Sequence, residues 1–430
     1  MRISVIGCGY VGLVTGNCIA NSKNSVNFYD ISKEKLTMLK HGKTYISEPG
    51  LDEIFLKNKS NGFLNFSENI DEVVINSDVI IVAVNTPPKN TGECNTDNLL
   101  DVIKDLVANY SINGKVIIIK STVSVGTTKY IQNYISKYNR NVKLFYNPEF
   151  LSQGNAVNDF LKPNKIVIGY DGKNCFRELI YEIYSNCELS KNQFIFTNYE
   201  TAELIKYSCN CFLALRISYI NLISQIADKF NADILAIEKS MKLDPRIGGH
   251  YLSSGLGFGG SCLTKDLSAL NYICNQNNIN SDLLSSIMEI NNKQIEIAAG
   301  KISKKINNFT EKIVLFGLSF KGNTNDIRCS QGIELVKYLI KLGYKNIYVY
   351  EPLNVELPNL NVKFSSDDVY KCVQDAKLIV ICNNNYDYNS LSWDKIGKMM
   401  KDNIIFDFRN ILDKYNLQKK GFNVIGFNER

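Results

Sequence analysis

The segment ISVIGCGYVG, residues 3–12, constrains the fold more than any other part of the chain. An apolar run leads into Gly7, Gly9 and Gly12 in GxGxxG spacing, a helical pattern follows, and the next strand pattern ends at Asp30. Glycines at this spacing allow a tight turn, close approach of the backbone to a pyrophosphate, and close packing of helix on strand. The segment therefore predicts a dinucleotide-binding domain.

Asp30 indicates which dinucleotide binds. An acid at the tip of the second strand suits a ribose 2′-hydroxyl and repels a 2′-phosphate, so NAD is favoured over NADP. Lys35 follows closely. It is as consistent with a cofactor contact as with a solvated helix lysine.

Further apolar runs alternate with helical patterns and predict a parallel sheet covered on both faces: DVIIVAVNTPP, KVIIIKSTVSVGTT and KLFYNPEF. Thr86, Thr122 and Glu149 stand at the carboxyl ends of these runs. Such ends surround the ligand in doubly wound sheets. A single threonine there can equally cap a helix, but the three together favour a ligand site.

Composition excludes several classes of protein. The chain has 430 residues, 45% of them hydrophobic, enough for two or three cores. Its formal charge is only +6, without a basic run, so no nucleic-acid surface is indicated. No signal-peptide pattern and no apolar run of membrane-spanning length is found, and we expect a cytoplasmic protein that binds no membrane.

The number and spacing of the cysteines and histidines limit which catalytic groups the chain can use. Twelve scattered cysteines fit a reducing compartment, and we expect most to be buried thiols. The two histidines, His41 and His250, belong to no cluster with metal-ligand spacing, so no metal site is predicted. Proton transfer is left to carboxylates, lysines and water.

Residues 203–230 contain neither glycine nor proline and predict one long helix able to span between domains. Lys206 and Asn210 are four residues apart and share a face of it. Such a pair is more often a wet surface than a site. The broad apolar face of the helix is consistent with internal core or with a dimer contact.

The segment GFGGSCLTKD, residues 257–266, surrounds one cysteine with glycines. A helix is expected to begin after them, with Ser261 as its cap and Cys262 in its first turn. A thiol at a helix N-terminus needs a further cation to become a thiolate at neutral pH, and Lys265 or Lys206 could supply it. A buried structural cysteine is the alternative interpretation.

Nine segments, in order along nearly the whole chain, resemble the nucleotide-sugar 6-dehydrogenases: GCGYVGLVTG, EPGLDEIF, STVSVGTT, NPEFLSQGNAVNDF, FLALRISYIN, DPRIG, GFGGSCLTKD, FGLSFKGNTNDIR and IFDFRN. The resemblance implies an α/β homodimer whose subunits have two doubly wound dinucleotide-binding-type domains joined by a long central helix. We expect an NAD-binding domain, a helical dimerisation domain with the cysteine loop, and a UDP-sugar-binding domain, at residues 1–198, 199–298 and 299–430.

The resemblance also implies a four-electron oxidation of UDP-glucose to UDP-glucuronate with two NAD. The same chemistry on GDP-mannose or a UDP-N-acetylhexosamine, or nucleotide-sugar binding without catalysis, are the alternatives. By matching motif positions, the implied catalytic residues are Cys262, Lys206, Asn210, Asp266, Glu149 and Thr122. Cys262 is the implied nucleophile.

Binding residues follow from the same matching. Those implied for NAD are Gly7, Gly9, Tyr10, Val11, Gly12, Asp30, Lys35, Thr86, Thr122, Gln153, Lys265 and Arg328. Those implied for the nucleotide sugar are Glu149, Phe150, Leu151, Ser152, Gln153, Lys206, Asn210, Arg246, Tyr251, Leu252, Ser253, Ser254, Gly255, Gly259, Lys321 and Arg409.

The chain departs from the family pattern at three positions. Gln153 replaces a glutamate, Thr264 replaces a proline in the cysteine loop, and Phe408 replaces a glycine in the last motif. The first departure removes a carboxylate beside the implied site. We expect activity to survive it because Glu149 remains.

Overall fold

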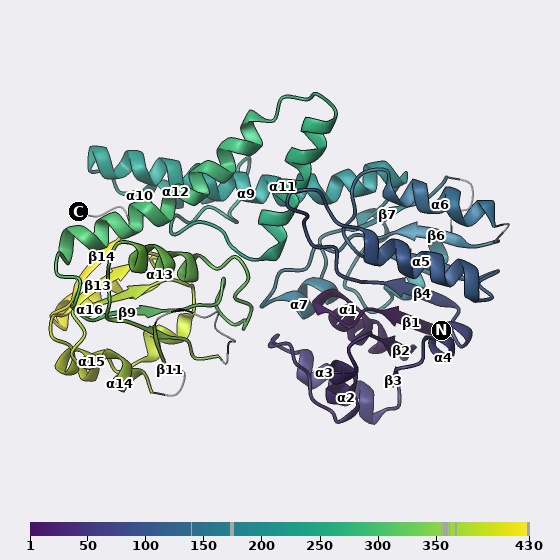
Figure 1. Cartoon of the computed structure of the whole chain (residues 1–430), viewed down its shortest axis with the longest axis horizontal. Coiled ribbons are helices and arrows are strands. Elements are labelled where there is room, and N and C mark those ends of the chain that lie inside the picture. The colour runs from purple at the N-terminus through teal and green to yellow at the C-terminus, as the bar shows by residue number, and fades with distance from the viewer. Residues whose placement is uncertain are drawn as a thin grey trace. The chain divides into compact units, whose positions relative to one another are not determined.

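The computed structural model in Figure 1 describes residues 1–138, 140–172, 176–353, 355, 360, 362–365 and 368–427. The chain divides into two compact units. Unit 1 comprises Met1–Cys209 and Ser268–Asn278, and unit 2 comprises Asn210–Leu267 and Ile279–Arg430. The predicted three-domain division is a finer one and stays a prediction.

Unit 1 is built on an eight-stranded sheet. Its strands are β1 (Arg2–Ile6), β2 (Ser25–Tyr29), β3 (Leu64–Ser67), β4 (Val79–Val82), β5 (Val116–Ile119), β6 (Lys143–Tyr146), β7 (Ile166–Gly169) and β8 (Phe194–Thr197). The helices between them are α1 (Tyr10–Ala20), α2 (Lys33–Lys40), α3 (Leu51–Ser60), α4 (Ile70–Ile75), α5 (Asp97–Asn109), α6 (Thr127–Lys137), α7 (Ala156–Leu161) and α8 (Arg177–Ile183).

The sheet of unit 1 has the strand order β3-β2-β1-β4-β5-β6-β7-β8, so the chain reverses its direction of travel between β1 and β4. Neighbouring strands are parallel except β6 and β7, which pair antiparallel through Tyr146 and Gly169. The predicted parallel sheet is thus confirmed for the nucleotide-binding half. In a doubly wound sheet, ligands bind at the point where the strand order reverses.

Successive side chains of a strand point to opposite faces of the sheet, so each strand contributes to two apolar layers. Ile3 and Val5 of β1 belong to a core with α1, α3, α7 and α8, whereas Ile6 belongs to the core on the opposite face. That second core includes α5, α6 and the start of the long helix α9 (Tyr199–Phe230). Because both faces are covered, the strands read as continuous apolar runs in the sequence.

Unit 2 contains a second parallel sheet, with strands β9 (Ile313–Phe316), β10 (Ile347–Tyr350), β11 (Lys363–Ser365), β12 (Leu378–Ile381), β13 (Ile404–Asp407) and β14 (Asn423–Gly426). Its order, β11-β10-β9-β12-β13-β14, is the doubly wound order 3-2-1-4-5-6. One face packs on α12 (Asp282–Lys305) and α13 (Gln331–Lys341). The other packs on α14 (Val369–Val373), α15 (Trp393–Met399) and α16 (Lys414–Lys419). The fold prediction of two doubly wound domains is confirmed.

Three helices precede α12 in the region that the sequence assigns to the central domain. α9 is a helix of 32 residues that begins four residues before the predicted start, and α10 (Ile234–Leu243) follows it. α11 spans Ser261–Gln276, so Ser261 is its first helical residue rather than a preceding cap. In the described parts of the chain, no helix has both the length and the apolarity needed to cross a membrane.

Candidate active site

The glycine turn after β1 leaves no room for side chains. A Cβ on Gly12 would lie 1.9 Å from the carbonyl oxygen of Gly7, and one on Gly7 would lie 2.7 Å from the carbonyl oxygen of Ala83. Gly7 also has φ +99°, a conformation that glycine adopts without strain. The backbone is therefore open to a pyrophosphate where α1 begins at Tyr10, with Val11 half-buried in its first turn.

Asp30 lies directly after β2, where the sequence places the ribose-binding acid. Its carboxylate accepts hydrogen bonds from the backbone N–H of Cys8 (2.7 Å) and of Ser32 (2.9 Å). The acid is thereby tied to the glycine turn. Lys35 lies on α2, with Nζ 5.6 Å from the centre of the Tyr45 ring. The geometry of the turn and of Asp30 is consistent with the predicted dinucleotide site.

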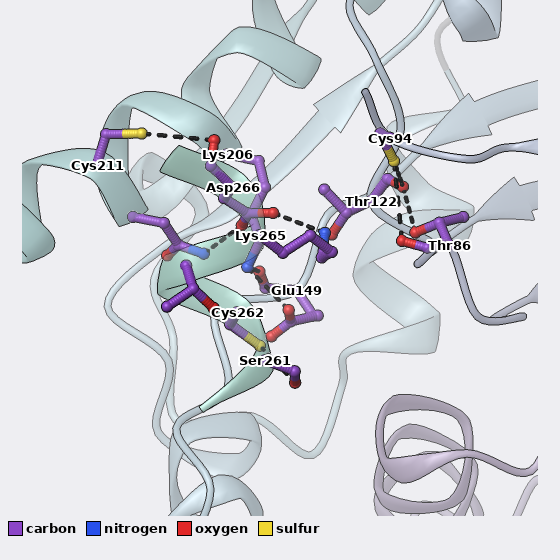
Figure 2. A network of polar contacts seen from close by, with 12 residues as sticks. Thr86, Cys94, Thr122, Glu149, Lys206, Cys211, Ser261, Cys262, Lys265 and Asp266 are labelled. Carbon is purple, nitrogen blue, oxygen red and sulfur yellow. Dashed lines mark hydrogen bonds and ion pairs between the residues drawn. The ribbon is translucent and has the colours of Figure 1, made fainter. Parts of the chain in front are cut away.

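The polar residues after β4 and β5 meet as predicted. Thr86 Oγ1 donates a hydrogen bond of 2.7 Å to the carbonyl oxygen of Thr122, and the Cys94 thiol donates to the same oxygen at 3.4 Å (Figure 2). Thr86 is buried and Thr122 half-buried. These contacts fix the loops at the carboxyl edge of the sheet, beside the glycine turn.

Glu149 and Lys206 form a buried ion pair. Lys206 Nζ donates to Glu149 Oε1 at 2.8 Å and to the Glu149 carbonyl oxygen at 2.7 Å (Figure 2). The two side chains are only 7% and 3% exposed. Burial raises the pKa of Glu149, but the Lys206 charge and hydrogen bond, the N–H of Leu151, and the Lys120 charge together lower it below its ordinary value. Glu149 is therefore a carboxylate at neutral pH.

The segment after Glu149 is fixed by backbone contacts. The N–H of Leu151 bonds Glu149 Oε2 at 2.6 Å, and the N–H of Ser152 bonds Asp159 at 2.8 Å. The Phe150 ring lies 5.4 Å from Lys206 Nζ. The predicted substrate segment is thus held against the buried ion pair.

Glu48 is a buried carboxylate that the sequence interpretation missed. It accepts the backbone N–H groups of Gly154 (2.7 Å) and Ala156 (2.6 Å), and it also accepts the hydroxyl of Tyr10. It thus links the glycine turn to the segment that carries Gln153. The motif EPGLDEIF contains Glu48, but nothing in that string predicts a contact with residues more than 100 positions later.

A second polar cluster lies in unit 2, around Asp266. Asn210 Nδ2 donates a hydrogen bond of 2.6 Å to Asp266 Oδ2. Lys265 Nζ donates one of 2.6 Å to Asp266 Oδ1 (Figure 2). Asp266 is 1% exposed. The structure therefore brings three predicted site residues together.

These ion pairs change the expected activation of the thiol. Lys265 and Lys206, the two lysines proposed to polarise Cys262, form their ion pairs with Asp266 and Glu149. Much of their positive charge is compensated by carboxylates. Arg328 is a third cation near the thiol, and its pKa is raised first by its hydrogen bond to Asp326 and also by the nearby Cys262 sulfur, but it too is paired with a carboxylate, at 2.5 Å from Asp326.

Cys262 is exposed in the first turn of α11. The preceding glycines bring its loop against the C-terminal sheet region: Gly260 N–H bonds the Arg328 carbonyl oxygen at 3.1 Å, and a Cβ on Gly259 would lie 2.3 Å from the Cys329 carbonyl oxygen. Only glycines permit these approaches. The thiol thus stands on a backbone that is fixed within its own unit.

The remaining described cysteines are mainly buried or half-buried, as expected, but Cys329 is exposed and that expectation was wrong for it. Cys329 follows Arg328 in a loop and has φ 50°. Cys175 lies outside the described residues.

The substrate loop predicted at Tyr251–Gly255 has mixed exposure. Tyr251 is exposed, but Leu252 is buried in an apolar cluster of unit 2. Ser254 is buried as well, and its N–H and hydroxyl both bond Glu238 Oε1, at 2.7 and 2.8 Å. Leu252 and Ser254 therefore anchor the loop with their side chains.

Arginines flank this loop. Arg409 Nε donates a hydrogen bond to the carbonyl oxygen of Cys382 (2.7 Å), and its Nη1 donates one to the carbonyl oxygen of Gly257 (3.3 Å). A Cβ on Gly255 would lie 3.5 Å from Cδ of Arg409. Arg409 and Ser253 also line a cavity of about 340 Å³ together with Leu235, Glu238, Lys239, Lys242, Leu243 and Asn410. Its cationic groups are Lys239, Lys242 and Arg409, of which Lys242 is paired with the lining carboxylate Glu238 at 3.1 Å.

Two further predicted residues lie outside this cavity. Arg246 forms an ion pair with Asp244 at 2.6 Å while its own side chain is 88% exposed. Lys321 is half-buried in the turn after β9, where its carbonyl oxygen accepts the Ser319 hydroxyl. The described residues hold no group of histidine, cysteine and acid side chains able to bind a metal ion.

Comparison with known proteins gives one consistent result. Three models of the UDP-glucose/GDP-mannose dehydrogenase family match: the NAD binding domain at residues 1–188, the central domain at 200–293, and the UDP binding domain at 314–414. A UDP-glucose 6-dehydrogenase of Rhizobium meliloti is 34% identical over 436 residues, which cover 98% of each chain.

Solved structures show the same relationship. A UDP-glucose dehydrogenase from Pyrobaculum islandicum has a TM-score of 0.87 at 28% identity, covering 95% of this chain and 94% of its own. A UDP-D-ManNAc dehydrogenase from Pyrococcus horikoshii has a TM-score of 0.85 at 26% identity, covering 100% and 99%. The chain therefore belongs to the UDP-glucose/GDP-mannose dehydrogenase family and is an NAD-dependent nucleotide-sugar dehydrogenase.

Proposed function

We propose that this enzyme oxidises the C6 alcohol of UDP-glucose to the carboxylate of UDP-glucuronate. The relative from Rhizobium meliloti supports this substrate, as does the match to the UDP binding domain. The observation that carries the proposal is the exposed Cys262 thiol on the first turn of α11, in the unit where Asp266 binds Asn210 and Lys265. A two-electron alcohol dehydrogenase has no need of that thiol.

Cys262 acts as the nucleophile in this proposal. The alcohol is first oxidised to an aldehyde, and the thiolate adds to the aldehyde carbon, forming a C–S bond. The resulting thiohemiacetal loses a second hydride and becomes a thioester. Water then adds to the thioester carbon, the C–S bond breaks, and the carboxylate leaves with the thiolate restored.

Lys206 and Asn210 stabilise the oxygen of the reacting carbon. They lie one turn apart on α9, so both side chains project from the same side of that helix. A fixed donor aimed at a developing oxyanion contributes about 10²–10³ in rate. The contacts of Lys206 with Glu149 and of Asn210 with Asp266 hold the two donors in place before substrate binds.

Glu149 activates the water that hydrolyses the thioester. It is ionised at neutral pH because the surrounding cations and N–H groups outweigh its burial. Thr122 and Asp266 assist by positioning water. Gln153 has no carboxylate, so Glu149 is the base in this segment.

NAD bound at the glycine turn supplies the hydride acceptor, and two equivalents are needed for each sugar. The Asp30 carboxylate accepts hydrogen bonds from the ribose hydroxyls, and the backbone at the first turn of α1 binds the pyrophosphate. Arg409 and Lys321 provide charge-assisted hydrogen bonds for the UDP diphosphate.

The sugar is the least constrained part of the proposal. The similarity to a UDP-D-ManNAc dehydrogenase supports a UDP-N-acetylhexosamine as the second candidate, with unchanged chemistry. The test is a comparison of kcat/KM for UDP-glucose, UDP-N-acetylmannosamine and GDP-mannose, followed by NADH absorbance. A preference of at least about tenfold for UDP-glucose, or about 1.4 kcal/mol, supports the proposal. Equal or higher kcat/KM for another sugar contradicts it.

We also propose that the enzyme is a homodimer paired through α9. Five large apolar side chains recur at helical spacing on this helix and are 39–80% exposed: Phe212, Tyr219, Leu222, Ile226 and Phe230. A stripe of this kind on one helix is typical of a surface covered by another protein chain. Light scattering should give twice the 48.6 kDa mass of the chain. Replacing Phe212 and Ile226 by aspartate should yield monomers.

A further inference from the structure

Lys120 is a buried lysine that the proposed chemistry has not used. It follows β5 directly, at the edge of the sheet that carries Thr122, and is 5% exposed. Its Nζ donates to Asn147 Oδ1 at 3.0 Å and to the Tyr184 hydroxyl at 3.2 Å. Within the described chain, no carboxylate lies within ion-pair distance of it. A buried ammonium with only neutral oxygen partners is costly and is seldom retained without a use.

The surrounding contacts fix this ammonium in place. Asn147 follows β6, takes a hydrogen bond from the Tyr184 hydroxyl, and donates from Nδ2 to the carbonyl oxygen of Val167 at 2.9 Å. Asn147 N–H bonds the carbonyl oxygen of Ile119 at 2.8 Å. Glu149 is two residues further along the same strand end. The network therefore ties the position of Lys120 to the segment that carries the proposed base.

The charged groups near Lys120 include one carboxylate. Burial lowers its pKa to about 8, the Glu149 charge opposes that shift, and the Lys206 charge adds to it. Cys187 also acts on it, but burial raises the pKa of that thiol to about 12, and burial raises the pKa of Tyr184 as well. Of the groups that act on Lys120, Glu149 is thus the one that is anionic at neutral pH.

Two buried ammonium groups therefore act on one buried carboxylate. Lys206 bonds Glu149 directly, while Lys120 acts on it through space. In the proposed function, Lys206 also stabilises the oxygen of the reacting carbon. Whenever Lys206 turns to that oxygen, Glu149 loses its direct partner, and burial favours protonation of the carboxyl group. A protonated Glu149 cannot activate water.

We propose that Lys120 is a positioning residue whose fixed charge keeps Glu149 ionised for thioester hydrolysis while Lys206 serves the reacting oxygen. This inference rests on the proposed function and adds a division of labour between the two lysines. Because Asn147 and Tyr184 also bond each other, the network stays closed when the ammonium is removed. The charge of Lys120 can therefore be tested apart from its packing.

The experiment compares Lys120→Met and Lys120→Gln with wild type. Glutamine retains a polar group for Asn147 and Tyr184 but has no charge. Pre-steady-state NADH formation and the pH profile of kcat are measured from pH 5 to 10 with saturating UDP-glucose and NAD. Both variants should retain the initial burst of NADH, while the acid limb of kcat moves up by about one pH unit, so that the steady rate at any pH on that limb falls about tenfold.

The matched control is Lys115→Met. Lys115 lies just before β5, and among the described residues its Nζ, like that of Lys120, bonds only neutral oxygen atoms, here the backbone carbonyl oxygens of Ile75 and Ser77. Its removal should leave burst, steady rate and pH profile unchanged.

The results distinguish a wrong inference about Lys120 from a wrong proposed function. A normal pH profile in Lys120→Gln with a defect only in Lys120→Met would mean that Lys120 serves packing, and would overturn the inference. Profiles that match wild type in both variants would overturn it too. If the methionine variant does not fold, the glutamine variant decides alone. Absence of NADH formation by wild type with any nucleotide sugar would instead overturn the proposed function.

Discussion

Lys206 Nζ lies 2.8 Å from Glu149 Oε1 and 2.7 Å from the Glu149 carbonyl oxygen, with both side chains almost fully buried. The lysine comes from α9 and the glutamate from the loop after β6. The contact therefore joins the start of the long helix to the carboxyl edge of the nucleotide-binding sheet. It also fixes one candidate oxyanion donor against the candidate base.

Lys206→Met should destabilise the protein by about 3–5 kcal/mol, because it leaves a buried carboxylate without its ion-pair partner. The double variant Lys206→Met/Glu149→Leu removes both charges and should recover most of that loss. Urea unfolding followed by circular dichroism measures both. A double variant as unstable as the sum of its single changes would show that the pair is not coupled.

Glu203 should make stability depend on pH in the opposite sense to an ordinary carboxylate. It accepts the N–H groups of Gly126 (2.6 Å) and Thr128 (2.8 Å) at the start of α6, and burial raises its pKa from 4.5 to about 7. The folded chain then binds more protons than the unfolded chain between those values, so stability falls as pH rises from about 4.5 to 7, by at most about 3 kcal/mol.

The check is the slope of unfolding free energy against pH in Glu203→Gln, which should be flatter over this window. Glu53→Gln, an exposed change on α3, serves as control and should keep the wild-type slope. An unchanged slope in Glu203→Gln would show that another group titrates there.

Gly12→Ala should weaken NAD binding strongly, because the new Cβ would lie 1.9 Å from the carbonyl oxygen of Gly7 and would displace the turn. We expect the Kd for NAD, measured by calorimetry, to rise by about 100-fold or more, equivalent to about 2.8 kcal/mol. Gly300→Ala introduces the same change on α12, where the Cβ meets no atom within 4 Å, and should bind NAD normally. Normal binding by Gly12→Ala would mean that NAD does not use this turn.

Cys262→Ser should stop product formation and leave NAD binding intact. The loss of the thiolate should lower kcat/KM by about 1,000-fold or more, equivalent to about 4 kcal/mol. Cys329→Ser removes the other exposed thiol of the unit and should stay active. Undiminished UDP-glucuronate formation by Cys262→Ser, measured by chromatography, would remove the covalent step from the account.

Much of this fold follows from local patterns. The glycine turn, Asp30 and the apolar strands predicted the first sheet, and the absence of glycine and proline predicted α9. No strand was predicted at β3, β7 or β8 of the first sheet or at β11 and β14 of the second, because these short strands gave weaker signals. Because β7 was not predicted, its antiparallel pairing with β6 was not predicted either.

The candidate site was harder to predict because its contacts join distant segments. The sequence identified Lys265 and Lys206 as charges for Cys262, yet their ion pairs go to Asp266 and Glu149. Glu48 bonds backbone groups more than 100 residues away. Only folding brings such partners together, whereas the spacing of residues in one helix, such as Lys206 and Asn210, can be read directly.

The most direct test of the central claim is the number of NADH molecules formed for each UDP-glucose consumed. The covalent four-electron mechanism predicts two NADH per UDP-glucuronate, with no aldehyde captured by an added hydrazine. One NADH per sugar, with UDP-linked aldehyde released into solution, would contradict it.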